Sequence, residues 1–535
     1  MSQLRGIVLP APTRGVTFLQ PKAAQDPSFC DWSQNFYHDN QKSKVRNGMK
    51  RYAYFSSTTP RYKGMGLWPD TSGTNKIYVV GKDGADFKIY DFTSSGSVSS
   101  IATVNYFTGS TLDVFTVYYK KNLFFFQPSN GVNTQGVRYD GSSWTAINYT
   151  HSIAPVGGCV YKSRLYLFGS QSTDLVYSEV NSVSGTTGSF PLDRVFSSGN
   201  RISWITTFSL SDTVTNDVYL AIGNDAGEVL VYSGDNPESL NWTLQGRFII
   251  GPPIYTAGYL YNYTQVIDYQ GDSLIITSTG LVSLRDLFTQ GSSGGGNKTI
   301  SSEIDDYWIR LVAGQKSVGL TQQWGGCFYP DKKRIVIFTH GFIERDGSLS
   351  QNKSCFFVFN TQTLGWSLYS QSNDSSYIPK MVYANNMLYF AHGLVSSVGQ
   401  CIYEFESKNY WKDDQASDGT SGTYEFELDG AWNSFGDQLS SKKVIGFQPI
   451  INTDFATSAS QFGMRVAVDM GRVVSGLAEV PAPNNSYSKR GYGVGDEGTF
   501  FQWRLEGDST STSSPTTGLE LYSVNALFEQ GDLKL

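Results

Sequence analysis

Residues that could support acid–base or metal chemistry are few and scattered in this 535-residue chain. None of its histidines belongs to an HExxH sequence or shares the spacing of metal ligands, and no Walker-type phosphate loop is present. A lone histidine in a strand is usually a packed or solvated residue. We therefore predict no catalytic, cofactor-binding or metal-binding residues, and we expect that the chain is not an enzyme. The histidines are His38, His151, His340 and His392.

Two pairs of adjacent carboxylates are the next candidates for acid–base chemistry. They are Asp305/Asp306 and Asp413/Asp414. Neighbouring positions on a helix or strand do not face each other, so neither pair forms a natural catalytic dyad. We interpret the first pair as the start of a helix and the second as part of a solvated loop.

The cysteines do not suggest a metal site or a disulfide framework. They are odd in number, they are scattered, and no two of them form a CxxC sequence. We expect buried free thiols and folding in a reducing cytoplasm. The five cysteines are Cys30, Cys159, Cys327, Cys355 and Cys401.

The elements that would position any site are repeated strands. Residues 218–254 read as three strands separated by turns rich in Gly, Asn, Asp and Pro. A Trp followed by Ser or Thr recurs after the second strand at Trp144, Trp242 and Trp366. The spacing of the copies overlaps that of propeller blades, so we predict an all-β fold with a β-propeller of six or seven blades over residues 71–410. Strand–turn–strand copies lie at 76–94, 122–141, 164–180, 273–284, 334–362 and 387–407.

Three further segments depart from the repeat. A glycine-rich linker and a helix predicted over 301–314 form an insertion at about 289–316, where acidic residues favour the first helical turn. Residues 411–535 lack the Trp pattern, so we predict a second antiparallel β platform domain. Residues 1–70 read as an extended arm that contributes to the platform and to subunit contacts. Its aromatic side chains, costly to leave in water, are Phe29, Trp32, Phe36 and Tyr37.

Charge and hydropathy narrow the classes of function. The net charge is −6 and no basic run occurs, which argues against tight binding of nucleic acid. No apolar run approaches the length of a membrane span, and the N-terminal residues lack the features of a signal peptide. Uncharged polar and aromatic residues in place of Lys and Glu suit large neutral contact surfaces.

One ordered series of strand and turn sequences resembles a known family. The series comprises Gly227 to Gly234, then Asp235 with Pro237 and Trp242, then Ile250 to Ile254, Gly271 to Leu274 and Gly280 to Leu284. It is similar to a stretch of the tail nozzle (tail tube) proteins of short-tailed bacteriophages, the podoviruses. Asn236 and Pro253 depart from the family pattern. Shorter similarities are LPAPTRG near the N-terminus, Asp31-Trp32, Val45 to Gly48 and Phe528 to Gly531.

The resemblance implies a structural virion protein that assembles in the bacterial host cytoplasm as a homo-hexameric ring. Such a ring lies below the portal and adaptor proteins, with propellers outside and β platforms near the axis. It continues the channel for double-stranded DNA, without sequence-specific binding, and it retains the genome until ejection. It also offers docking surfaces for tail fibres or spikes.

Two loops are candidates for narrowing that channel before ejection. One is 486–498, with Gly491, Tyr492 and Gly493, and the other is 291–299, with Gly294, Gly295 and Gly296. Their glycine content and their position outside the repeat motivate the prediction. The sequence does not decide between them.

Two other functions remain as alternatives. Gly157-Gly158 before a strand resembles one kelch unit, which would indicate a protein-interaction propeller. The segment that begins at Asp140 and ends at Trp144 faintly resembles the aspartate box of sialidases, which would indicate a glycosidase acting on host-surface glycans. Neither pattern recurs in the other copies.

Overall fold

The computed structural model shows an all-β protein built from antiparallel sheets, with two short α-helices. In the described part of the chain, no helix is long and apolar enough to cross a membrane. The structure describes residues 4–533 except 58–59, 71–72, 105–106, 108–113, 128–134, 152, 170–171, 200, 212–217, 255–264, 292–298, 320–323, 373–379, 393–400, 409, 411–412, 415–420, 454–461, 471, 474–477, 480–491 and 510–517.

Seven sheets follow one another along the chain between residues 50 and 404. From the innermost strand outward they are β6 (Arg61–Pro69), β7 (Asn75–Asp83), β8 (Asp86–Asp91), β10 (Ser100–Val104); β11 (Phe115–Tyr119), β12 (Asn122–Gln127), β13 (Gln135–Tyr139), β14 (Trp144–Ala146); β16 (Pro155–Tyr161), β17 (Arg164–Gly169), β18 (Asp174–Tyr177), β20 (Gly188–Pro191); β21 (Ile202–Ser209), β22 (Val218–Asn224), β23 (Glu228–Ser233), β24 (Thr243–Ile249); β25 (Val266–Tyr269), β26 (Asp272–Thr277), β27 (Gly280–Ser283); β28 (Gly325–Tyr329), β29 (Arg334–Ile343), β30 (Leu349–Asn360), β31 (Gly365–Ser372); and β32 (Met381–Ala384), β33 (Met387–His392), β34 (Cys401–Glu404), β5 (Lys50–Phe55), β9 (Gly96–Val98).

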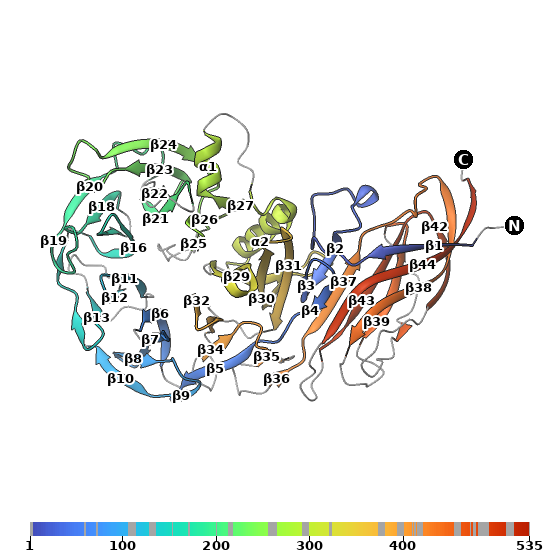
Figure 1. Cartoon of the computed structure of the whole chain (residues 1–535), viewed down its shortest axis with the longest axis horizontal. Coiled ribbons are helices and arrows are strands. Elements are labelled where there is room, and N and C mark those ends of the chain that lie inside the picture. The colour runs from blue at the N-terminus through green and yellow to red at the C-terminus, as the bar shows by residue number, and fades with distance from the viewer. Residues whose placement is uncertain are drawn as a thin grey trace.

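Contacts between the inner strands close these sheets into a ring, which we call the sheet ring (Figure 1). β6 contacts β11, β11 contacts β16, and β16 contacts β21. β21 contacts β26 of the fifth sheet, β25 contacts β28, β28 contacts β32, and β32 contacts β6 again. The last sheet is completed by β5 from the N-terminal part of the chain, which pairs antiparallel with β34. Segments distant in sequence therefore hold the ring closed.

The repeated tryptophans join each sheet to the one before it. Trp144 precedes the outer part of the second sheet and lies 5.2 Å from Tyr78 of the first, measured between ring centroids. Trp242 occupies the same place in the fourth sheet and stacks on Tyr166 of the third at 6.2 Å. Large aromatic rings at this position bury apolar area between neighbouring sheets, which explains why the pattern recurs.

Two six-stranded sheets form a second unit, which we call the sandwich, on the other side of the molecule (Figure 1). Their inner faces share one hydrophobic core; for example, Phe435 stacks at 4.7 Å on Phe528 and at 5.5 Å on Phe501. The first sheet has the order β3 (Phe36–His38), β4 (Ser43–Val45), β44 (Leu519–Leu533), β38 (Ser440–Thr453), β42 (Tyr492–Gly498), with β1 (Leu4–Pro10) on β44; the second has β2 (Cys30–Gln34), β37 (Glu425–Gly430), β43 (Phe501–Asp508), β39 (Phe462–Val468), β40 (Arg472–Val473), with β41 (Ala478–Glu479) on β39.

These pairings change the predicted boundaries. The first 70 residues are not one arm: β1 to β4 belong to the sandwich, whereas β5 and β6 belong to the sheet ring. The ring begins at Lys50 because β5 supplies the strand that completes the last sheet. The strand signal of this segment was visible in the sequence, but its partners were not.

The predicted helix over 301–314 is present as α2 (Asp305–Ser317), which follows the 3-10 turn η2 (Ser302–Ile304). Its buried face includes Trp308, whose Nε1–H donates to the carbonyl of Thr277 at 2.9 Å. A second helix, α1 (Leu284–Gln290), was not predicted; the hydroxyl of Ser283 caps it by accepting from the backbone N–H of Asp286. The remaining short elements are η1 (Lys22–Ala24), η3 (Pro330–Lys332), β15 (Tyr149–Thr150), β19 (Gly185–Thr186), β35 (Asp413–Asp414) and β36 (Ser421–Gly422).

Gly227, in the turn between β22 and β23, is a position that only glycine fits. Its φ is +89°, and a Cβ there would lie 2.4 Å from the carbonyl oxygen of Ile250. Gly84, in the matching turn between β7 and β8, has φ +63° but open space around it. Gly84→Ala should therefore cost about 1–2 kcal/mol of unfolding free energy from the backbone alone. Gly227→Ala should cost about 1–3 kcal/mol more because the backbone must move.

Urea denaturation followed by tryptophan fluorescence would measure both variants. Equal losses for the two would show that the close approach to Ile250 does not constrain this turn.

Candidate functional site

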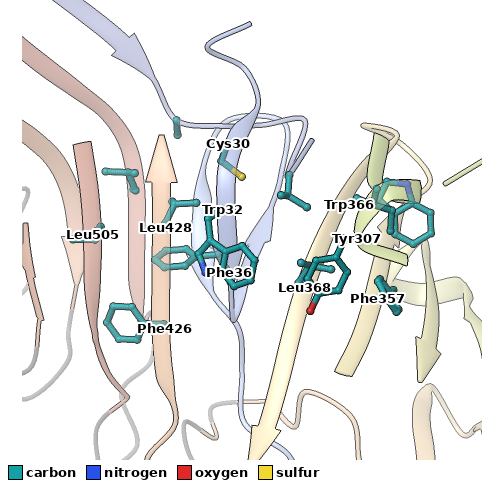
Figure 2. Packing of buried hydrophobic residues seen from close by; sticks show 14 of the residues in the cluster. Cys30, Trp32, Phe36, Tyr307, Phe357, Trp366, Leu368, Phe426, Leu428 and Leu505 are labelled. Carbon is teal, nitrogen blue, oxygen red and sulfur yellow. The ribbon is translucent and has the colours of Figure 1, made fainter. Parts of the chain in front are cut away.

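The N-terminal segment lies between the sheet ring and the sandwich and packs against both. Figure 2 shows Trp32 and Phe36 beside Phe426 of the sandwich, with Tyr307 of α2 on the ring side. Trp32 lies 6.2 Å from Tyr307, and Phe36 meets Phe426 edge to face at 5.6 Å. The two units thus share one continuous core through this segment, which we call the junction.

All four aromatic residues suggested for contacts with another subunit are buried within this chain. Phe29 is 1% exposed, Phe36 is fully buried, and Trp32 and Tyr37 are each 5% exposed. Phe29 is also covered by Arg14, whose guanidinium lies 4.4 Å from the ring centroid. The junction itself covers these side chains, so no neighbouring subunit is needed to remove them from water.

A buried ion pair fixes the point where the chain passes from the sandwich into the ring. Arg46 is fully buried, and its Nη1 donates to Asp413 at 2.8 Å while its Nη2 donates to the other carboxylate oxygen at 2.5 Å. Its remaining donors reach the side-chain oxygen of Asn35 at 2.8 Å and the carbonyl of Ser370 at 3.0 Å. The Tyr424 ring lies 3.9 Å below the guanidinium. The prediction that Asp413 belongs to a solvated loop was therefore wrong.

A second buried ion pair lies nearby in the ring. Arg334 of β29 binds Glu406, and its guanidinium stacks 3.3 Å over the Tyr37 ring. Burial alone would raise the pKa of Glu406, but the arginine outweighs it and the pKa is lowered. The Tyr369 hydroxyl donates to the same carboxylate at 2.9 Å. This pair holds the N-terminal strand β3 against the sixth sheet.

A third group of charges crosses from ring to sandwich near the molecular surface. Arg345, in the hairpin between β29 and β30, contacts Glu427 and Asp429 of β37, each at 2.6 Å. Arg504 of β43 approaches Asp429 at 3.4 Å. Together with the shared core, these contacts fix the orientation of the two units.

His38 is a structural residue of the junction. Its Nδ1 lies 2.7 Å from the carbonyl of Pro12, and its Nε2 lies 2.9 Å from the hydroxyl of Ser33. An uncharged imidazole satisfies both contacts by donating from Nδ1 and accepting at Nε2. Burial lowers the pKa of His38 to about 4, since protonation would place an unpaired charge in the core.

An apolar groove lies open on the outer face of the sandwich, over β1, β44 and β38. It has a volume of about 550 Å³. Leu527 forms its floor between Gly6 and Gly446, two neighbours in register that carry no side chain. Val8, which is 65% exposed, forms one wall. β1 pairs with β44 through one edge, and among the described residues its other edge has no strand partner.

The two predicted gate loops are covered only in part by the structure. Gly491 and Gly294 to Gly296 lie outside the described residues. Tyr492 and Gly493 are in β42, where they pair with Phe447 and Gly446 of β38. This part of the predicted 486–498 loop is therefore a strand; its many glycines concealed the pairing, which depends on a strand 45 residues earlier in the chain.

The described residues do not gather into a metal site, and no three His, Cys, Asp or Glu side chains among them could hold an ion. The five cysteines are free, as predicted. Asp140 accepts hydrogen bonds from the backbone N–H groups of Ser142 and Ser143 at 2.8 Å, so it closes its own turn. These contacts account for the sequence pattern that resembled an aspartate box.

The residues of the family resemblance serve the fold. Gly227 and Gly234 allow tight turns with positive φ, and Gly280 leaves room for the Ser301 hydroxyl and the Asp305 carboxylate beneath α2. A Cβ at Gly280 would lie 2.5 Å from that hydroxyl. The matching order of glycines therefore preserves a backbone path and carries no chemistry of its own.

Comparisons with known proteins do not assign the chain to a family. No family model matches the sequence, and no curated protein matches it. Among solved structures, Sqt1 of Saccharomyces cerevisiae aligns with 70% of this chain and 100% of its own length, at 8% identity and a TM-score of 0.38. U3-55K aligns with 65% and 96%, at 11% identity and a TM-score of 0.39. An exo-β-1,3-galactanase from Phanerochaete chrysosporium aligns with 90% and 100%, at 10% identity and a TM-score of 0.27. Likenesses this low carry no conclusion about activity.

Sequence reasoning missed Arg46, Asp413 and the sandwich groove. Val45 to Gly48 was noted only as part of a resemblance, although an arginine among apolar and small residues was a signal that it needed a buried acidic partner. The partner lies 367 residues away, and neighbouring sequence does not identify it.

Loss of the Arg46–Asp413 pair should strongly destabilise the protein. Asp413→Asn leaves the guanidinium buried without a counter-charge, which should lower the unfolding free energy by about 3–5 kcal/mol. The exposed pair Arg310–Asp306, with a 3.0 Å contact, is a matched control. Asp306→Asn should change stability by less than about 0.5 kcal/mol. Similar losses for both variants in urea denaturation would contradict the role given to Asp413.

Acidification should weaken the protein through His38. Its pKa is near 6.5 in the unfolded chain and about 4 in the fold, so the neutral ring stabilises the protein above pH 6.5. That contribution is lost as the pH falls from 6.5 towards 4, by about 2–3 kcal/mol at pH 4.5. Thermal unfolding at pH 7 and pH 4.5 would measure it, and His38→Gln should reduce the difference. An unchanged difference in that variant would assign the acid sensitivity to other groups.

Proposed function

We propose that this chain is a structural virion protein, the subunit of the tail nozzle of a short-tailed phage. In this proposal the sheet ring is a seven-bladed β-propeller and the sandwich is the platform domain. The subunits form a hexamer that continues the DNA channel below the portal and adaptor. The hexamer retains the genome until ejection and offers docking surfaces to fibres or spikes.

The observation that carries the proposal is the groove on the sandwich. Leu4, Val8 and Leu527 are 57%, 65% and 39% exposed there, although each is a large apolar side chain. An exposed apolar hollow beside an unpaired strand edge is costly for a protein that stays monomeric, and it invites pairing with another chain. A second copy of this chain is the occupant that we propose.

The geometry of the groove suits a ring. Closed rings form when one surface of a subunit binds a different surface of the next, so each copy needs two distinct faces. The first sandwich sheet has β1 near one end and β42 at the other. Pairing of these ends from copy to copy would repeat around an axis and place the sandwiches innermost.

The junction supports the same function. Three sets of ion pairs and one continuous core hold the sandwich and the sheet ring in a fixed orientation. A subunit that must form a channel wall under load benefits from such rigidity. The low share of charged residues, 16%, and the net charge of −6 suit a wall past which DNA slides without adhering.

Electron microscopy and mass photometry of the purified chain test the proposal directly. We expect six-fold rings with a central hole, and labelling of the tail tip when the protein is located in virions. A chain that stays monomeric at micromolar concentration and is absent from particles would contradict the proposal. In that case a kelch-like interaction protein or a glycosidase would be tested next, the latter by screening for glycan cleavage.

Assembly should depend on the groove. Leu527→Asp places a charge on its floor and should weaken ring formation at least about tenfold, since a carboxylate would have to be desolvated. Gly6→Val should fill the groove with little effect on folding, because a Cβ there meets only the Ala526 carbonyl at 3.9 Å. Leu240→Asp, at a fully exposed leucine of the sheet ring, is the control and should still assemble.

Mass photometry across a dilution series would quantify all three variants. Rings that form equally well with Leu527→Asp and Gly6→Val would exclude the groove as the contact between subunits.

A further inference from the structure

A cavity of about 310 Å³ lies on the inner side of the sheet ring, where inner strands of five sheets converge. Its position is independent of the sandwich groove and of the junction. It is lined by Phe115, Thr116, Gly158, Val266, Ile267, Asp268, Gly325, Gly326, Cys327, Phe328, Lys380 and Met381. We call it the axial cavity.

Two opposite charges line the axial cavity without pairing with each other. Asp268 of β25 makes no ion pair among the described residues, and its side chain is open to the cavity. Lys380, just before β32, donates from Nζ to the hydroxyl of Thr116 and likewise has no acidic partner within the described chain. A carboxylate and an ammonium in a confined space would pair if geometry allowed, so their separation leaves both available to a ligand.

The protein around both groups strengthens their need for a partner. Burial lowers the pKa of Lys380 to about 8, and burial raises the pKa of Asp268. Both directions mean that each charge is incompletely solvated where it stands. The thiol of Cys327 does not substitute for a partner, since burial raises its pKa to about 12 and keeps it uncharged at neutral pH.

We propose that the axial cavity binds a small zwitterion, a molecule that carries one ammonium and one carboxylate group. Its carboxylate would lie against Lys380 and Thr116, and its ammonium against Asp268. Such a ligand is neutral overall and compensates both charges at once, whereas an amine or an acid alone leaves one charge of the cavity uncompensated. Phe328 and Met381 supply apolar walls for the carbon chain between the two ends.

The volume sets the size of the ligand. At about 30 Å³ for each water, the space holds on the order of ten water molecules, and hence a ligand of about ten non-hydrogen atoms. Free amino acids and short ω-amino acids fall in this range. A folded protein partner or an oligosaccharide does not fit.

A series of ω-amino acids tests both the charge requirement and the spacing between the charges. Glycine, 4-aminobutyrate and 6-aminohexanoate would be titrated into the full-length protein at pH 7, with isothermal calorimetry or ligand-observed NMR as the readout. Butyrate and butylamine carry the same carbon chain with one charge each. We expect at least one zwitterion to saturate the protein, and to bind at least about tenfold more tightly than either single-charge compound.

Two substitutions then assign the ends of the ligand. Asp268→Asn should abolish the advantage of 4-aminobutyrate over butyrate, and Lys380→Met should abolish its advantage over butylamine. A loss of folding would remove all binding, so the change of preference separates recognition from structure. Lys316→Met and Asp306→Asn, at exposed positions of α2, are matched controls that should bind as the unmodified chain does.

The proposal is overturned if no zwitterion of the series saturates the protein at concentrations up to about 10 mM. It is also overturned if both cavity variants keep the preference for the zwitterion. Neither result bears on ring formation, so the nozzle proposal and the axial cavity are tested separately.

Discussion

The buried contact between Arg46 and Asp413 is the constraint on which the arrangement of the two units depends. It joins the residue where the chain leaves the sandwich to the residue where the chain returns towards it. A guanidinium without a counter-charge would be expelled from this place, and the neighbouring Asn35, Ser370 and Tyr424 contacts would go with it. The pair therefore defines one packing of the N-terminal segment and excludes alternatives that leave either charge unpaired.

From that fixed point, the N-terminal segment organises both units. Its strands β1 to β4 enter the sandwich, its strand β5 completes the last sheet of the ring, and its aromatic residues fill the junction. Such pairing between distant parts of the chain carries a high entropic cost during folding. The result is a rigid body with exposed apolar surface on the sandwich, which is consistent with a subunit that completes its surface by assembly.

Local sequence was a good guide wherever one sheet repeats the work of another. The alternation of apolar and polar residues, the Gly and Asn turns, and Trp144, Trp242 and Trp366 indicated the strands of the ring and their repeat. The helix of 305–317 was equally visible because Trp308, Leu311 and Val312 recur at helical spacing. These signals are local, since backbone geometry and side-chain period act within a few residues.

The sequence by itself determined the all-β class, the repeated strand unit, the inserted helix and the free thiols. Only the tertiary structure decided that β5 closes the ring, that Asp413 is buried, and that Asp268 and Lys380 face one cavity. The physical reason is the range of the interactions. Turns and strand patterns are encoded by neighbours, whereas ion pairs, strand partners and cavities depend on residues brought together from hundreds of positions apart.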